Sequence, residues 1–422
     1  MKILHYTIGF APVRTGGLVS YATDLMLEEI NQGQEVYALY PALQTFFAKS
    51  PIIKLGKEIK GIKTYELYNS LPLALFGGIY EPDDFKTPCD IKIFSQFLKE
   101  LKPDVIHLHS LMGLHKEFFE AAKSLNIRLI FTTHDYYGLA PIPSFYYNGK
   151  SFDEDNNNLA WNIMSHDALP TNKLRIFQSK WYIIIRDILK KMNKNPKHIS
   201  QTPIKDIRET KNYATLKQYY LDIFALIDCF HFNSQLAKNI FESNVKSIKE
   251  SAVISITTSQ IKAREVAKNT RKKMHLAFIG PDEVYKGYFD FLDYISTINT
   301  ENYTVYTYGH YPNDKAPSFV KQMGRFKQED LLSVYENIDI LVVPSQWKET
   351  FGLVVLEALS YGVTVYVSEN VGAKDLVSEE YIFKSLKELE SKLLDVDSHA
   401  YTIKDLNQHT KELLELYKGD FR

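Results

Sequence analysis

The sequence is poor in cysteine and has no long apolar run. Its 422 residues include two cysteines, Cys89 and Cys229, whose separation gives no ligand-like spacing, so neither a zinc site nor a disulfide framework is supported. No stretch reaches the roughly 18 apolar residues of a membrane-spanning helix, and the opening MKILHYTIGF lacks the long apolar core of a signal peptide. We therefore expect a protein of the reducing cytoplasm.

The sequence also lacks a charge excess of either sign. Lysine and arginine number 50 and aspartate and glutamate 51, so no overall field attracts nucleic acid, and we expect none as a partner. No G-x-x-x-x-G-K-[ST] motif is present to cradle a triphosphate, and no G-x-G-x-x-G follows the first predicted strand, which argues against a dehydrogenase. The chain is long enough for two or three domains.

Short apolar runs alternate with amphipathic, helix-like segments along most of the chain. In the first half the predicted strands include KILHYTIGF, QEVYALYP, KPDVIHLHS and IRLIFTTHDYY. The alternation resumes near residue 273 with KKMHLAFIG, YTVYTYGH, DILVVPS and VTVYVSE. This pattern predicts α/β architecture, with parallel sheets that carry helices on their faces.

We expect two Rossmann-like domains that face each other. The predicted N-terminal domain spans 1–255, with a helical insertion at about 150–215, and the C-terminal domain spans 256–404. A helix at 405–422 is expected to cross back to the N-terminal domain, and the polar, basic segment of about 255–272 joins the two domains. Ligands of parallel sheets bind at the carboxyl ends of the strands, so the predicted active site is the cleft between the domains.

The stretch KETFGLVVLEAL follows the buried strand DILVVPS and places two carboxylates at the predicted site. Glu349 falls in the loop after the strand, and a helix is expected to begin near Phe351 or Gly352, where unpaired N–H groups suit a phosphate. If the segment were helical throughout, Glu357 would lie roughly 12 Å from Glu349, which is the scale of a nucleotide sugar. The spacing alone fits an amphipathic helix with solvated glutamates at least as well.

The run PSQWKETFGLVVLEALSYGVTVYVSENVGAKDLV resembles the signature region of glycosyltransferase family 4, whose members are retaining enzymes with the two-domain GT-B fold. Glu349 and Glu357 match the two glutamates of that family, inside E-x-F-G-L-x-x-x-E-A. The resemblance covers most of the chain. It implies that Glu349 lies at the transferred sugar and that Glu357 binds the donor ribose. The other expected donor-binding residues of this stretch are Thr350, Phe351, Gly352 and Leu353.

Three further segments match the family and extend the expected donor site. FIGPDEVYKGY carries a Lys-Gly in which Lys286 would contact the donor diphosphate as a point charge. Arg325 and Phe326 fall in a segment that resembles the base-reading part of the family. Gly16 and Gly17 match the loop whose backbone N–H groups approach the diphosphate. A solvated lysine and a generic tight turn are the alternative interpretations.

TTHDYY resembles the His-Asp pair that family members carry at a strand end, so His134 would hydrogen-bond the sugar. With Glu349 and Lys286, it completes the expected catalytic set. His109 and Ser110 end the neighbouring strand and are expected on the acceptor side. Structural roles are equally open for these last two residues.

The match has departures that weaken the expected donor site. Many family members have an arginine where this chain has Pro281, so a cationic diphosphate contact is missing or comes from Arg14 or Arg325. Asp375 stands where the family has a glutamate. No catalytic metal and no cofactor are expected, because the Asp-Val-Asp at 395–397 follows a polar helix far from any strand end and is interpreted as a solvated loop.

Residues 171–198 carry eight Lys/Arg and one Asp, interleaved with Trp181, Tyr182 and isoleucines. A basic amphipathic helix with aromatic residues suits the surface of an anionic membrane. The alternative is a surface helix of the first domain that packs by its apolar side.

These features predict a retaining glycosyltransferase that moves a hexose-type sugar from a nucleoside diphosphate sugar to a glycan or lipid-linked glycan acceptor. The expected setting is bacterial surface polysaccharide or glycoconjugate synthesis, in the cytoplasm or on the inner face of the membrane. Two alternatives stay open. One is a non-catalytic partner subunit of another glycosyltransferase, motivated by Pro281, and the other is a nucleotide-sugar epimerase on the same fold.

Overall fold

The computed structural model describes residues 1–42, 50–177, 202–262, 264, 271–298, 301–393 and 403–419. The chain divides into two compact units. The first unit comprises Met1–Asn233, Lys238–Ile254 and Thr410–Arg422, and the second comprises Ser234–Ala237 and Ser255–His409. The chain therefore returns to the first unit at its C-terminal end.

An eight-stranded sheet forms the centre of the first unit, in the order β10-β9-β6-β5-β1-β2-β4-β3. Its neighbours pair in parallel, apart from the antiparallel pair of β3 and β4. The strands are β1 (Lys2–Tyr6), β2 (Glu35–Pro41), β3 (Ile52–Leu55), β4 (Lys63–Tyr68), β5 (Val105–Leu108), β6 (Arg128–Thr132), β9 (Cys229–Phe232) and β10 (Glu250–Val253). A separate hairpin pairs β7 (Tyr146–Tyr147) with β8 (Lys150–Ser151).

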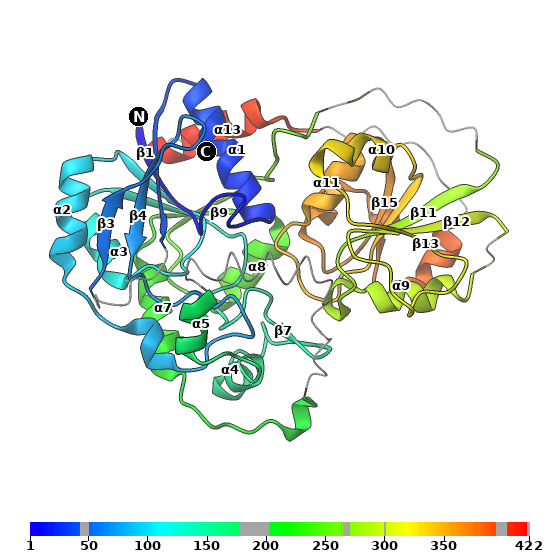
Figure 1. The fold of residues 1–422 in the computed structure, drawn as a ribbon, viewed down its shortest axis with the longest axis horizontal. Coiled ribbons are helices and arrows are strands. Elements are labelled where there is room, and N and C mark those ends of the chain that lie inside the picture. Colours follow the sequence, from blue (N-terminus) through cyan, green and yellow to red (C-terminus); the bar gives the residue numbers. More distant parts are fainter. Residues whose placement is uncertain are drawn as a thin grey trace. The chain divides into compact units, whose positions relative to one another are not determined.

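Helices cover this sheet, which is why its central strands are buried at almost every position rather than at alternate ones. Their bounds are α1 (Gly17–Asn31), α2 (Ile91–Leu101), α3 (Lys116–Ser124), α4 (Asn158–Met164), α5 (Thr171–Phe177), α7 (Ala214–Leu226), α8 (Gln235–Asn244) and α13 (Leu406–Lys418). Figure 1 shows α13, in red, beside α1, in blue, although the two helices stand at opposite ends of the sequence. A hydrogen bond of 2.9 Å between the Tyr417 hydroxyl and the Glu29 carboxyl group joins them.

A six-stranded, fully parallel sheet forms the second unit, in the order β13-β12-β11-β14-β15-β16. The strands are β11 (Met274–Ile279), β12 (Tyr303–Tyr308), β13 (Lys321–Gly324), β14 (Ile340–Val343), β15 (Thr364–Ser368) and β16 (Ile382–Phe383). The helices are α9 (Tyr288–Ile295), α10 (Leu331–Tyr335), α11 (Leu353–Ser360) and α12 (Leu389–Lys392). Within this unit, α10 and α11 lie on one side of the strands and α9 lies on the other (Figure 1).

Short 3-10 helices occupy several connections of both units. They are η1 (Pro82–Lys86), η2 (Ile204–Asp206), η3 (Val284–Lys286), η4 (Gln328–Asp330), η5 (Gly372–Leu376), η6 (Glu379–Tyr381) and η7 (Leu386–Glu388). In the described part of the chain, no helix combines the length and the apolar character needed to cross a bilayer.

Gly287 links η3 to α9 at a point where two loops of the second unit touch. Its φ is 74°, and a Cβ there would lie 1.9 Å from the carbonyl oxygen of Pro344. No L side chain fits such a position, because the clash is with backbone. Packing therefore requires the glycine of the Lys-Gly pair. The close approach that it allows brings Lys286 against the loop that follows β14.

The two parallel sheets with helices on their faces confirm the predicted α/β class. Helix α11 begins at Leu353 with Gly352 as its N-cap, one or two residues after the predicted start at Phe351 or Gly352. The four residues from Glu349 to Gly352 are not helical, so the spacing derived for a continuous helix from Glu349 to Glu357 does not apply. Of the basic stretch 171–198, α5 covers the start, while residues 178–198 lie outside the described residues, as does the Asp-Val-Asp at 395–397.

Candidate functional site

A cavity of about 220 Å³ lies in the first unit at the carboxyl ends of its central strands. Gly16 and Gly17, which follow β1, line it together with Ser110, which follows β5, and Asp135, which follows β6. In a parallel sheet these ends meet at one edge. Two of the predicted donor-binding glycines and one predicted acceptor-side residue are thus brought to one cavity.

Gly16 is the N-cap of α1 and has φ 124°, a conformation that L side chains rarely adopt. A Cβ there would meet no atom within 4 Å, so the backbone conformation, rather than space, requires glycine. The first N–H groups of the 15-residue helix α1 begin beside the cavity. Such a terminus favours a negatively charged group.

His134 and His109 form a hydrogen bond with each other. Nδ1 of His109 lies 3.2 Å from Nε2 of His134, and Nε2 of His109 lies 3.0 Å from Nδ1 of His5. His109 is 1% exposed, whereas His134 is half-buried. Both ring nitrogens of His109 therefore contact other histidines, which is the structural role that the sequence left open beside the acceptor contact.

Burial keeps these imidazoles neutral. It lowers the pKa of His134 to about 3, with the neighbouring His231 contributing. It also lowers the pKa of His109 well below its ordinary value, with His5 as the next cause. At neutral pH both rings are therefore uncharged, and each has one donor and one acceptor nitrogen.

Asp135 is the aspartate of the His-Asp pair, but it was not predicted as a site residue. It lines the cavity, and burial raises the pKa of its carboxyl from 3.8 to about 6, against the opposing effect of a hydrogen bond from the backbone N–H of Tyr137. A carboxyl group that titrates near neutral pH in a cavity is a candidate for acid-base chemistry. Its place directly after a strand end was the sequence signal that could have identified it.

The second unit carries the two glutamates of KETFGLVVLEAL at the carboxyl edge of its own sheet. Glu349 follows β14 and is 5% exposed, and the amine of Lys286, which follows β11, lies 2.8 Å from its Oε1. The ammonium group also lies 5.3 Å from the ring centre of Trp347. The structure thus brings two predicted catalytic residues, Glu349 and Lys286, into one ion pair.

Gly352 shapes the backbone between the two glutamates. Its φ is 103°, and a Cβ would lie 2.9 Å from Cγ1 of Val371 and 3.4 Å from Oε2 of Glu349. The glycine therefore allows the Glu349 carboxylate to lie close to the N-terminus of α11, whose first N–H groups have no partner within the helix. Thr350, Phe351 and Leu353 belong to the same turn, in which Thr350 and Phe351 are buried and Leu353 is half-buried.

Glu357 lies inside α11 and is half-buried. The hydroxyl of Tyr335, in α10, donates a hydrogen bond of 3.0 Å to its Oε2. Burial raises the pKa of the Glu357 carboxyl, and this hydrogen bond opposes the rise. The alternative of two solvated glutamates on a helix face is therefore wrong for both residues. Tyr335 carried no sequence signal, because an aromatic residue at helical spacing is usually a core residue.

Arg325 and Phe326 follow β13, at the same edge of the second sheet. Phe326 is half-buried and meets the ring of Tyr308 edge to face, with 6.2 Å between the ring centres. The exposed Arg325 guanidinium lies 5.8 Å from the ring centre of Tyr311. Aromatic and guanidinium planes at a strand end suit the stacking of a planar group.

Two family models match the chain, one in each unit. Residues 15–168 match the model of Glycosyltransferase Family 4, and residues 259–385 match that of Glycosyl transferases group 1. An uncharacterized 42.6 kDa protein in the cps region of Klebsiella pneumoniae is 22% identical over 339 residues, which cover 78% of this chain and 75% of that protein. A 41.2 kDa protein of the same region is 28% identical over 159 residues, 36% of this chain and 43% of that protein.

Several solved structures resemble the whole chain. HepE from Anabaena, in complex with UDP and glucose, has a TM-score of 0.55 at 12% identity and covers 99% of both chains. Sucrose-phosphate synthase from Thermosynechococcus elongatus has a TM-score of 0.54 at 14% identity, covering 100% of this chain and 95% of that one. At this identity the likeness concerns the fold, and these neighbours have the GT-B fold.

The raised pKa of Asp135 predicts a pH-dependent cost to stability. Between about pH 4 and 6 the folded protein keeps a proton that the unfolded chain releases, so the free energy of unfolding falls as the pH rises through this window. Asp135→Asn removes the effect and should be more stable than the wild type at pH 7.5 by up to about 3 kcal/mol. Denaturant unfolding at several pH values measures the difference.

The difference between Asp135→Asn and the wild type should disappear below about pH 4, where both side chains are neutral. Asp314→Asn, at an exposed position, is the matched control and should give a small difference at every pH. A constant difference between Asp135→Asn and the wild type across this range would contradict the assignment.

Proposed function

The chain is a glycosyltransferase of the family 4 type with the GT-B fold, and from this premise we propose that it is a retaining enzyme with a nucleoside diphosphate sugar as donor. The proposed reaction transfers a hexose-type sugar to a glycan or to a lipid-linked glycan. The observation that carries the proposal is the ion pair of Glu349 and Lys286 beside the N-terminus of α11.

The second unit supports donor binding through three kinds of group. The N-terminal amides of α11 and the ammonium of Lys286 would share the charge of the diphosphate. Glu349 would accept hydrogen bonds from hydroxyl groups of the sugar, and Glu357 from those of the ribose. Arg325 and Phe326 offer planar groups for the base. Pro281 removes one cation from this set, and the Lys286 ammonium is the charge that remains closest to Glu349.

In the proposed step the bond between the anomeric carbon and the diphosphate oxygen breaks, and a bond from that carbon to the acceptor oxygen forms on the same face. The leaving diphosphate takes the proton of the acceptor hydroxyl, so the atoms and charges balance without a protein base. The protein then acts mainly by positioning both reactants and by stabilising charge on the diphosphate. In the first unit, the cavity that is lined by Gly16, Gly17 and Ser110 would contribute polar contacts to the substrates.

The biological setting is proposed from the relatives. The cps region of Klebsiella pneumoniae encodes two of them, which supports a role in bacterial surface polysaccharide synthesis in the cytoplasm. HepE has been solved with UDP and glucose, and a trehalose-6-phosphate protein of E. coli with UDP-2-fluoro glucose, which supports a nucleotide-sugar donor here. We expect catalysis without a metal ion, since Lys286 and the helix end supply positive charge at the diphosphate.

The basic stretch 171–198 is proposed to attach the enzyme to the inner face of an anionic membrane, close to lipid-linked acceptors. Charge reversal at Lys190, Lys191 and Lys194 should release the protein from vesicles that contain anionic lipid, as measured by co-sedimentation at low salt. Circular dichroism controls for folding. If the wild type does not bind such vesicles, the attachment hypothesis fails, while the transferase proposal stands.

The two glutamates should separate sugar orientation from nucleotide binding. Glu349→Gln should lower kcat strongly and leave nucleoside diphosphate affinity nearly unchanged, since that ligand has no sugar. Glu357→Gln should weaken nucleoside diphosphate binding about tenfold to a hundredfold, because losing a charged hydrogen-bond partner costs roughly 1.5–3 kcal/mol. Calorimetric titration measures the affinity, and turnover of the full donor measures kcat.

Each glutamate variant serves as the control for the other, because both substitutions keep shape and remove charge. Loss of nucleotide affinity in Glu349→Gln but not in Glu357→Gln would reverse the two roles. Unchanged binding and unchanged turnover in both variants would remove the pair from the active site.

A further inference from the structure

A continuous chain of hydrogen bonds runs through the core of the first unit, from the backbone carbonyl of Ile254 to the ring of His134. Eight contacts of 2.6 to 3.2 Å join nine groups, in the order Ile254, His231, Thr132, His107, Tyr417, Glu29, His5, His109 and His134. Apart from the half-buried His134, every member is at most 3% exposed. Water therefore cannot supply missing hydrogen bonds to most members of this hydrogen-bond chain.

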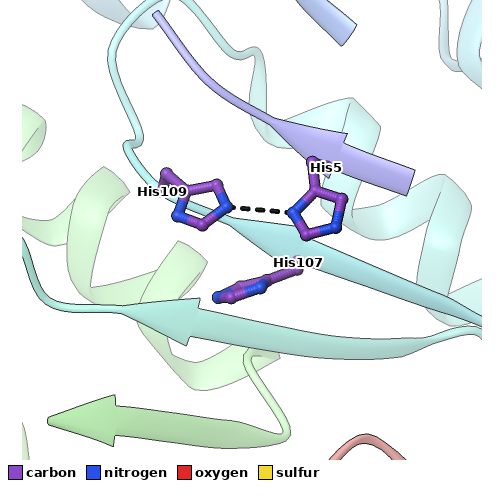
Figure 2. Close-up of side chains that lie close together, drawn as sticks. All are labelled: His5, His107 and His109. Carbon is purple, nitrogen blue, oxygen red and sulfur yellow. Dashed lines mark hydrogen bonds between the residues drawn. The ribbon is translucent and has the colours of Figure 1, made fainter. Parts of the chain in front are cut away.

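Three of these histidines lie close enough together to suggest a metal site. Figure 2 shows His5 and His109 joined by a hydrogen bond, with His107 beside them. Their ligand atoms lie within 4.8 Å of one another. However, all six ring nitrogens already have hydrogen-bond partners in the protein, as the order above shows. The closeness of the three histidines is therefore explained by their places in the hydrogen-bond chain, without an ion.

The positions of the hydrogen atoms in the first half of the hydrogen-bond chain follow from the carbonyl of Ile254, at its first end. The carbonyl of Ile254 only accepts, so Nε2 of His231 carries a hydrogen and, in a neutral ring, Nδ1 accepts from the hydroxyl of Thr132. Thr132 then accepts from Nε2 of His107, and Nδ1 of His107 must accept from the hydroxyl of Tyr417. The single hydrogen of Tyr417 is thereby used.

Tyr417 also lies 2.9 Å from Oε1 of Glu29, and that contact now lacks a hydrogen. A proton on Oε1 of Glu29 supplies the missing hydrogen, which Glu29 then donates to the hydroxyl oxygen of Tyr417. Oε2 of Glu29 then accepts from Nε2 of His5, at 2.6 Å, and Nδ1 of His5 accepts from Nε2 of His109. Nδ1 of His109 accepts in turn from Nε2 of His134. All eight contacts are satisfied, and every imidazole is neutral.

We propose that Glu29 is protonated and that Glu29, His5 and His109 are positioning residues, which hold the ring of His134 as its Nε2–H tautomer. The protonation and the tautomers stand on the hydrogen-bond chain alone.

The surroundings of Glu29 support a neutral carboxyl group. It is fully buried, and the titratable groups that face it are Tyr21 of its own helix, His5 of β1 and Tyr417 of α13. In the described part of the chain no lysine or arginine forms an ion pair with it. A buried carboxylate without a cation is costly. The rival arrangements place a cation on His107 or on His231 instead, but both rings are fully buried, and burial disfavours the charged form. Burial lowers the pKa of His107 well below its ordinary value.

A long-range proton–nitrogen NMR spectrum of the full chain with ¹⁵N-labelled histidine tests the tautomers directly. The signals are assigned by single substitutions. At pH 7 the five histidines of the hydrogen-bond chain should each show a neutral ring with the hydrogen on Nε2. His115 is an internal reference with the opposite tautomer, because its Nδ1 donates to the carbonyl of Thr87. A cationic ring at His107 or His231, or an Nδ1–H tautomer at His5, His109 or His134, would overturn the proposal.

Two substitutions of Glu29 separate a neutral acid from a carboxylate. Glu29→Gln keeps one acceptor for His5 and one donor for Tyr417, so it should keep all the histidine tautomers and the melting temperature of the wild type. Glu29→Met removes both groups and should let the signals of His109 and His134 move to averages of two tautomers, with that of His115 unchanged. Loss of folding or of the tautomer pattern in Glu29→Gln would show that a carboxylate is needed and contradict the proposal. Neither readout depends on transferase activity.

Discussion

A carboxylate that is buried at the end of a parallel strand must be compensated, and the site in the second unit depends on how this is done. Glu349 is 5% exposed and is held 2.8 Å from the ammonium of Lys286. Removing one partner of such a buried pair leaves an uncompensated charge and destabilises a protein strongly. Gly287 and Gly352 make the arrangement possible, since a side chain at either position would collide with its neighbours. In the proposed function, a diphosphate competes for Lys286 and the sugar hydroxyls satisfy Glu349. Donor binding and charge compensation are therefore coupled in the proposed function.

The first unit also buries a carboxyl group, that of Glu29 in α1, but its partners are imidazoles and a tyrosine in place of a lysine, and we propose that it is neutral. Glu29 is fully buried, and its partners are His5, from β1, and Tyr417, from α13. The helix that contains Tyr417 is therefore tied to the same network as the strand ends that bear His109 and His134. A substitution of Tyr417 can in this way change the hydrogen bonds of His109 and His134 through the intervening groups.

The alternation of strands and helices was readable from the sequence because apolar period and turn residues are local properties. The start of α11 followed from Gly352, and the strand-end positions of His134 and Glu349 followed from the apolar runs before them. The pairing of Lys286 with Glu349 was not predictable, because 63 residues separate them and the order of strands in a sheet is not a local property. Whether His109 binds a ligand or has a structural role could not be decided from the sequence, for a related reason. Its position at a strand end suggested a ligand contact, whereas the partners that enclose it come from β1 and from the segment after β6. Asp135 needed the cavity to be recognised.

The central claim is that the chain transfers a sugar with retention, and the products formed from a nucleotide sugar in the absence of acceptor test it most directly. Proton NMR of the purified protein with UDP-, GDP- and ADP-sugars would follow the slow reaction with water. The account predicts nucleoside diphosphate and free sugar from one of these donors, with the first-formed anomer keeping the configuration of the donor. Appearance of a different nucleotide sugar would indicate an epimerase, and a first-formed sugar of inverted configuration would contradict a retaining transferase.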